Sequence, residues 1–210
     1  MCKYTLQIAD QYFIIKYIDW NILGGRAVEK LEPELKTLSL TGRLCYLFMC
    51  IEKYLTLCYP EREWVLVAKR CWQWTNVYWN EGCDIYSAVV PEYLFEFDDY
   101  EKTNTLVFDG KLSQKDYLEL TNLFAGLTTG DSEDEINQVL KLPIEFNIEC
   151  ECTDFNNADI PTLKILYKML HFLSLHNISF PFVNGIQNMT VDQKNGWGNF
   201  IDSEYLSVII

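Results

Sequence analysis

The strongest constraint on the fold is the segment from Thr41 to Tyr59, in which apolar side chains recur at helical spacing. They are separated by steps of three or four residues and comprise Leu44, Leu47, Phe48, Ile51, Leu55 and Cys58. A helix with such a stripe must bury it against other elements. Pro60 should end the helix, because the residue before a proline avoids the helical region of backbone space.

A second helix is expected from Arg62 to about Val77, antiparallel to the first around Pro60. Trp79 and Gly82 are expected to mark its exit. The tryptophans of this region are Trp64, Trp72, Trp74 and Trp79. We interpret them as aromatic core, because a stacking platform for nucleic-acid bases would need a basic groove beside it.

The rest of the chain also favours helices with irregular connections. Further helices are expected at 3–19, 26–31, 82–96 with a break at Pro91, 113–127, from a cap at Asp131 or Ser132 to Pro143, and 161–176. Loops are expected at 97–112, with a short strand at 106–108, at 148–160 and over most of the tail 177–210, which would end in a short helix or strand near 203–209. The fold class predicted is therefore mainly α: a single-domain irregular helical bundle over residues 1–210, with room for a minor β element.

Charge is distributed unevenly along the chain. The 17 basic and 30 acidic residues give a net charge of −13. In residues 81–159, 19 acids and four lysines give −15, whereas the remainder carries +2. Nucleic-acid binding requires a basic surface that neutralises phosphates. The charge argues against nucleic acid and anionic membranes as direct partners, and it favours a basic protein.

Two runs within this region, 92–101 and 131–135, are the most acidic. The first mixes carboxylates with aromatic side chains, which is typical of protein interfaces, although a charged run is more often just a solvated face. The second run would also stabilise the start of a helix. The candidate partner-binding residues are Glu92, Tyr93, Glu96, Asp98, Asp99, Tyr100, Glu101, Asp131, Glu133 and Asp134.

The residues give little indication of catalysis, and no cofactor is expected. The histidines, His171 and His176, are five residues apart and do not share a helix face, and HExxH, P-loop, GxGxxG and GxSxG motifs are absent. Cys150-x-Cys152 lacks a second ligand pair for zinc. One catalytic alternative stays open: Asp98, Asp99 and Glu101 could hold a divalent metal for acid–base chemistry if they converge in a pocket.

Eight cysteines without a recognisable secretory signal suggest reduced thiols and a cytoplasmic protein. The most apolar segment, Leu44 to Ile51, is too short to cross a bilayer. It is also bracketed by Arg43, Glu52 and Lys53. We therefore expect no membrane-spanning helix.

Several local patterns resemble the helical immunity proteins of bacterial polymorphic-toxin and contact-dependent growth inhibition systems. They are Leu38-x-x-x-Gly42-Arg43 at the start of an apolar helix, Ile51-Glu52-Lys53 within it, the acidic middle region and Asn195-Gly196-Trp197-Gly198 near the end. The resemblance covers mostly residues 38–80 and the tail. It implies a protein that binds and neutralises the toxin domain encoded beside it, often a nuclease, and it assigns no contact residues.

Two other functions are compatible with the same residues. A helical adaptor or nucleic-acid mimic would use the acidic surface on a different basic protein. A metal-dependent enzyme would use Asp98, Asp99 and Glu101. The oligomeric state stays open.

Overall fold

The computed structural model describes residues 25–151, 153–200, 202 and 204–210, so the helix expected at 3–19 lies outside the described residues. In these ranges the chain is mainly α-helical, as predicted. The α-helices are α2 (Gly25–Thr37), α3 (Leu40–Cys58), α4 (Val65–Trp74), α5 (Trp79–Ser87), α6 (Pro91–Leu94), α7 (Tyr100–Leu106), α8 (Gln114–Phe124), α9 (Glu135–Cys150) and α10 (Phe155–Leu175). Three short 3₁₀ helices follow: η1 (Val183–Gly185), η2 (Gln193–Gly196) and η3 (Glu204–Leu206).

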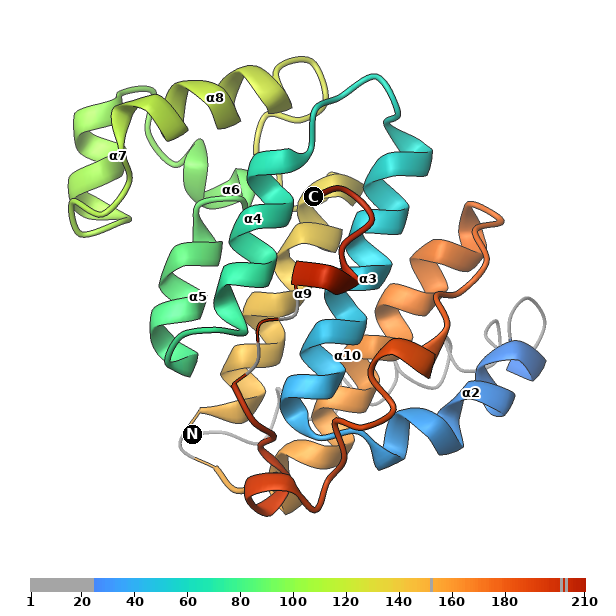
Figure 1. The fold of residues 1–210 in the computed structure, drawn as a ribbon. Helices are drawn as coiled ribbons and strands as arrows, with labels where there is room; N and C mark the ends of the chain where they lie inside the picture. Colours follow the sequence, from blue (N-terminus) through green and yellow to red (C-terminus); the bar gives the residue numbers. More distant parts are fainter. Residues whose placement is uncertain (1–24, 152, 201, 203) are drawn as a thin grey trace, which may run out of the picture.

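Helix α3 lies at the centre of the bundle and packs against α4, α9 and α10 (Figure 1). Ser39 caps its start, because the Ser39 hydroxyl accepts a hydrogen bond of 3.2 Å from the backbone N–H of Gly42. Tyr59 follows its last residue, so the end predicted before Pro60 is confirmed. Most of α3 is buried on all sides, which a two-helix hairpin alone could not achieve.

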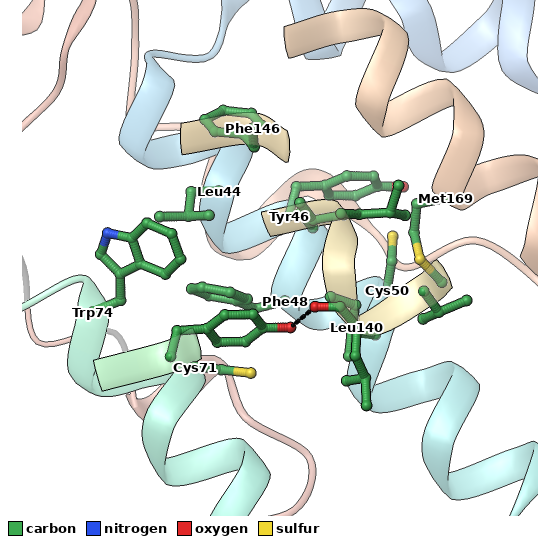
Figure 2. Packing of buried hydrophobic residues seen from close by; sticks show 14 of the residues in the cluster. Leu44, Tyr46, Phe48, Cys50, Cys71, Trp74, Leu140, Phe146 and Met169 are labelled. Atoms are coloured by element: carbon green, nitrogen blue, oxygen red, sulfur yellow. Dashed lines mark hydrogen bonds between the residues drawn. The ribbon is translucent and has the colours of Figure 1, made fainter. Parts of the chain in front are cut away.

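The core joins aromatic rings from several helices. The ring of Phe48 in α3 lies 5.7 Å from that of Trp72, 6.0 Å from that of Trp74 and 5.7 Å from that of Tyr86, measured between centroids. Figure 2 shows this packing between α3, α4 and α9. Trp64, Trp72 and Trp74 are buried, which confirms the interpretation of these tryptophans as core. Such offset and edge-on contacts are the favourable arrangements for aromatic pairs.

The tail runs along α3 rather than forming a layer of its own: residues 189–197 lie at the start of α3, and η3 and the residues after it lie beside α3 and α4 (Figure 1). The backbone N–H of Ser39 donates to Met189 O at 2.8 Å, and that of Thr41 donates to Trp197 O at 3.0 Å. An isolated antiparallel bridge joins Leu38 to Thr190. These bonds satisfy backbone groups that a helix start leaves without partners.

Two charged side chains of α3 are fully buried and bind distant segments. Arg43 donates to Asp159 Oδ1 at 2.6 Å and to the Thr162 hydroxyl at 2.9 Å, both in α10. Glu52 accepts from Trp72 Nε1 at 2.7 Å. Its carboxylate also accepts from the Ser207 hydroxyl at 2.6 Å and from the backbone N–H of Val208 at 2.8 Å. The sequence had suggested that Arg43 and Glu52 merely bracket an apolar stretch.

Several predicted boundaries are wrong. Trp79 begins α5 instead of ending the preceding helix, and α7 occupies residues for which a loop and a strand were expected. Helix α10 begins at Phe155, capped by Asp154, so residues 155–160 are helical. Asp134 rather than Asp131 or Ser132 precedes α9. The predicted cap at Ser113 is confirmed, since its hydroxyl accepts from the backbone N–H of Asp116.

Prolines lie inside three of the helices: Pro33 in α2, Pro143 in α9 and Pro161 in α10. Helices had been expected to end before Pro33, to end or bend at Pro143 and to begin at Pro161, so the end expected at Pro33 and the start expected at Pro161 are wrong. In α9 the carbonyl of Leu140, one turn before Pro143, accepts a hydrogen bond of 2.8 Å from the Tyr86 hydroxyl (Figure 2). This contact ties α5 to α9 next to the proline, although the carbonyl that Pro143 deprives of its helical partner is that of Val139.

Among the described helices, none combines the length and the apolar character that crossing a bilayer would require. This agrees with the expectation from the sequence for these parts of the chain.

Candidate partner-binding surface

The first acidic run spans the end of α6, a short connection and the start of α7. Asp99 is the N-cap of α7, and its Oδ1 accepts a hydrogen bond of 2.9 Å from the backbone N–H of Lys102. The side chains of Glu96, Asp98 and Glu101 are exposed. The chain turns here from one short helix into the next, so these acids project into solvent.

Glu92 differs from the other acids of this run, because its carboxylate is paired. Lys141 Nζ lies 2.6 Å from Glu92 Oε2, and Asn137 Nδ2 donates to the same oxygen at 3.3 Å. The hydrogen bond from Lys141 holds the pKa of Glu92 below its ordinary value. Glu92 therefore ties α6 to α9 and contributes less unpaired charge than an exposed acid would.

The aromatic side chains of the run pack inwards. Tyr93 is half-buried, with Lys141 Nζ 5.9 Å from its ring centroid. The Tyr100 hydroxyl donates to Leu112 O at 2.9 Å, and its ring lies 5.3 Å from that of Tyr117. Tyr93 and Tyr100 thus hold the acidic segment in place and offer only part of their surface to a partner.

The second run presents two exposed acids, Asp131 and Glu133, in the turn before α9. Asp131 Oδ1 accepts from the backbone N–H of Glu133 at 2.9 Å, which fixes the turn. Asp134 is half-buried, and its Oδ2 accepts from the Thr128 hydroxyl at 2.6 Å. Of the three candidates in this run, Asp131 and Glu133 are therefore the more available to a partner.

Gly130 brings the two runs together. Its φ is +84°, and a Cβ added there would lie 2.9 Å from Pro91 O and 3.1 Å from Phe95 Cβ. Only glycine accepts this φ and this close approach without strain. Since Glu96 follows Phe95 and Asp131 follows Gly130, the start of the second run lies beside residues 91–96 of the first run.

The exposed acids of this surface are not neutralised by neighbours within the described residues. The ion pairs of the middle region involve Asp84, Glu92, Asp116, Glu135, Glu145 and Asp159. None involves the six exposed candidates, which are Glu96, Asp98, Asp99, Glu101, Asp131 and Glu133. We call these six residues the acidic surface.

The metal-binding alternative receives no support from the geometry. Across the described ranges, no three His, Cys, Asp or Glu side chains are grouped in a way that could hold a metal ion. Asp98, Asp99 and Glu101 are neighbouring exposed acids, and the Asp99 carboxylate is used as a helix cap. Cys150 is buried, and burial raises the pKa of its thiol to about 12, while Cys152 lies outside the described residues.

One polar cluster beside the acidic surface was not anticipated. Glu135, the first residue of α9, accepts at Oε1 from the Tyr54 hydroxyl at 2.6 Å and lies 2.5 Å from His176 Nε2. The sequence had placed Tyr54 on a core helix and had given His176 no role. The cluster joins three helix ends, and nothing in the local patterns signals such a contact.

Comparisons with known proteins identify no relative. No family model matches the chain, and neither the curated proteins nor the solved structures include a significant match. The functional argument therefore depends on the residues themselves.

Proposed function

We propose that this protein is an immunity protein that binds a cognate bacterial toxin domain, a basic nuclease, and neutralises it through the acidic surface. The observation that carries the proposal is the meeting of the two acidic runs at Gly130. It places six exposed carboxylates, none in an ion pair within the described residues, on neighbouring segments. The resemblance noted in the sequence supplies the class of partner.

Electrostatics explains how such a surface would act. A dense negative patch accelerates association with a basic partner by roughly 10–10³-fold, and salt weakens the effect. A nuclease binds phosphates with lysine and arginine side chains. Carboxylates presented to the same side chains would occupy the positions of phosphates and keep the substrate out.

The rigid mounting of the acids supports a tight complex. Tyr100 and Tyr117 pack beneath the start of α7, and Asp131 and Asp134 are fixed by hydrogen bonds in their own turn. Preorganised groups lose little conformational entropy on binding. The acidic surface would therefore bind without a large rearrangement of the backbone.

The test is capture of the partner by tagged protein from its own host lysate, at low and at high salt, with identification by mass spectrometry. We expect stoichiometric capture of one basic toxin domain, and inhibition of its nuclease activity by the purified protein. Substitution of Asp98→Lys together with Glu133→Lys should lower the affinity by about 100-fold or more, since it reverses two charges in one contact.

A matched control is Glu29→Lys with Glu34→Lys, which changes the net charge equally at exposed positions of α2, on the opposite side of the molecule (Figure 1). Equal loss of affinity in both double variants would mean that only the net charge of the protein matters, and it would contradict the assignment of the acidic surface as the binding site. Capture of a basic protein without toxin activity would instead favour the adaptor or nucleic-acid mimic.

A further inference from the structure

An open hollow of about 570 Å³ lies where α3 and α10 end. It is lined by Leu57, Cys58, Tyr59, His176, Asn177, Ile178 and Ser179. Its volume falls within the range of about 300–1,000 Å³ that is usual for ligand-binding clefts. Leu57 is 57% exposed there, and Leu175, the residue before His176, is 51% exposed. Of these two, Leu57 lines the hollow and offers it an apolar side chain that a partner could cover.

Two rings line the hollow, those of Tyr59 and His176. Both contact the buried ring of Tyr54 edge-to-face, at 5.9 Å and 5.5 Å between centroids. Tyr59 in turn contacts Trp64 at 6.1 Å. A further ring entering the hollow would extend this series of edge-to-face contacts, each worth a small gain beyond area burial.

The hollow adjoins the acidic surface. His176 lines the hollow and is held by Glu135, and Glu135 directly follows the turn that presents Asp131 and Glu133. At the other side of that turn, Gly130 contacts Phe95 of the first run. The turn at residues 130–134 therefore connects the hollow, through Glu135, with residues 91–95 of the first run, through Gly130.

We propose that this hollow receives an aromatic side chain of the toxin domain, flanked in the toxin by lysine or arginine. The inference rests on the proposed function and names the apolar anchor of the same interface. Charge complementarity selects this occupant, because the exposed Glu133 lies two residues before Glu135, whose carboxylate contacts His176 in the lining of the hollow. A pocket filled by an aromatic anchor and bordered by charged pairs is the usual composition of an interface hot spot.

Lys53 determines the orientation of the anchor. Its Nζ donates to the Ser179 hydroxyl at 2.8 Å, so a cation is present on the rim at Ser179. A basic flank of the partner would be repelled on that side and attracted on the side of Glu133. The partner chain is therefore expected to run from the hollow towards the acidic surface rather than over Ser179.

The hollow can be tested without the partner by NMR titration with phenethylammonium chloride, which combines an aromatic ring with a cation. We expect saturable shifts of the backbone amides of Leu57, His176 and Ile178. Ethylammonium chloride, which has the charge but no ring, should give much smaller shifts. The absence of saturable shifts at these amides would overturn the proposal.

The second readout uses the captured toxin domain. Leu57→Ser removes an exposed apolar contact, and it should weaken toxin binding by about tenfold or more. Ile160→Ser is the matched control, because Ile160 is 63% exposed near the start of α10, about 24 Å along the helix from His176. If Leu57→Ser binds the toxin domain with unchanged affinity, the proposal of an aromatic anchor in the hollow is wrong, while the proposed function is unaffected. Failure of the wild-type protein to capture any toxin would sink the proposed function, and the assigned partner with it.

Discussion

Arg43 and Glu52 of α3 are buried and hydrogen-bonded, whereas the charged side chains of the acidic surface are exposed to solvent. Arg43 and Glu52 have almost no exposed area, and each is held by hydrogen bonds from other segments. Asp98 and Glu133 are exposed and take part in no ion pair within the described residues. Arg43 and Glu52 stabilise the arrangement of the helices, whereas Asp98 and Glu133 leave their charge available to a partner. The comparison teaches that hydrogen bonds and ion pairs within the protein separate charged side chains with a structural role from those proposed to bind a partner.

The largest effect is expected from Asp159→Asn. The substitution leaves the Arg43 guanidinium charged and buried without its carboxylate. The expected cost is about 2–3 kcal/mol, because the Asp159 side chain is itself 36% exposed and asparagine keeps an acceptor oxygen. Burial already lowers the pKa of Arg43, and the hydrogen bond that Arg43 donates to Asp159 opposes this. Urea unfolding measures the change. The control is Glu145→Gln, which removes the exposed pair with Lys168 and should cost less than about 1 kcal/mol.

The next largest loss of stability is expected from Glu52→Gln, and its size should depend on pH. A glutamine amide would turn a donor towards groups that already donate, at a cost of about 1–3 kcal/mol. Burial raises the pKa of Glu52 above its ordinary 4.5, so the folded protein keeps this proton to higher pH than the unfolded chain. Stability contributed by this group therefore falls as pH rises from about 4.5 through the raised folded pKa. The wild-type advantage over Glu52→Gln should shrink across that window in urea unfolding, and a constant difference would contradict the shift.

Gly130→Ala tests the junction of the two acidic runs. Its positive φ and the approach of Pro91 O within 2.9 Å predict a loss of about 2 kcal/mol, together with weaker partner binding. Gly126→Ala is a close control, because its φ is +74° but a Cβ would meet nothing within 4 Å. Thermal unfolding of both variants measures the two losses of stability. The loss in Gly126→Ala gives the cost of the positive φ alone, and the additional loss in Gly130→Ala gives the cost of the close approach to Pro91. Equal losses would mean that the close approach contributes nothing.

The smallest changes in stability are expected from alanine substitutions of the neighbouring acids Asp98 and Asp99, and they should differ between the two. Asp99→Ala removes the N-cap of α7 and should cost about 1 kcal/mol. Asp98→Ala should change stability by less than about 0.5 kcal/mol, because its carboxylate is exposed. Both substitutions should weaken capture of the partner. A larger stability loss for Asp98→Ala than for Asp99→Ala would reverse this assignment.

The sequence predicted the elements that depend on local patterns. The apolar face from Leu44 to Cys58 and the cap at Ser113 both require only neighbours within a few residues, and both predictions are confirmed. Helix α7 escaped prediction because seven residues are too few to show a periodic apolar face. Pro161 was placed at a helix start because the sequence could not show that Asp154 caps α10 two turns earlier.

The candidate site could be predicted only in part. Composition indicated where acidic residues gather, and most of those chosen are exposed. It could not show that Glu92 is paired with Lys141, 49 residues away, nor that Gly130 joins the two runs. The contact between His176 and Glu135 depends on the ends of two helices that meet only in the folded chain.

The link from Glu52 to Ser207 and Val208 also has a consequence for folding during synthesis. Trp72 is made soon after Glu52, but the other two donors follow about 155 residues later. At translation rates of about 5–20 residues per second, this carboxylate waits roughly 8–30 s for them. Until then the buried Glu52 carboxylate lacks two of its three hydrogen-bond donors. Residues 207 and 208 therefore complete the hydrogen bonding of a buried charge, and a nascent chain lacking them would leave that charge poorly compensated.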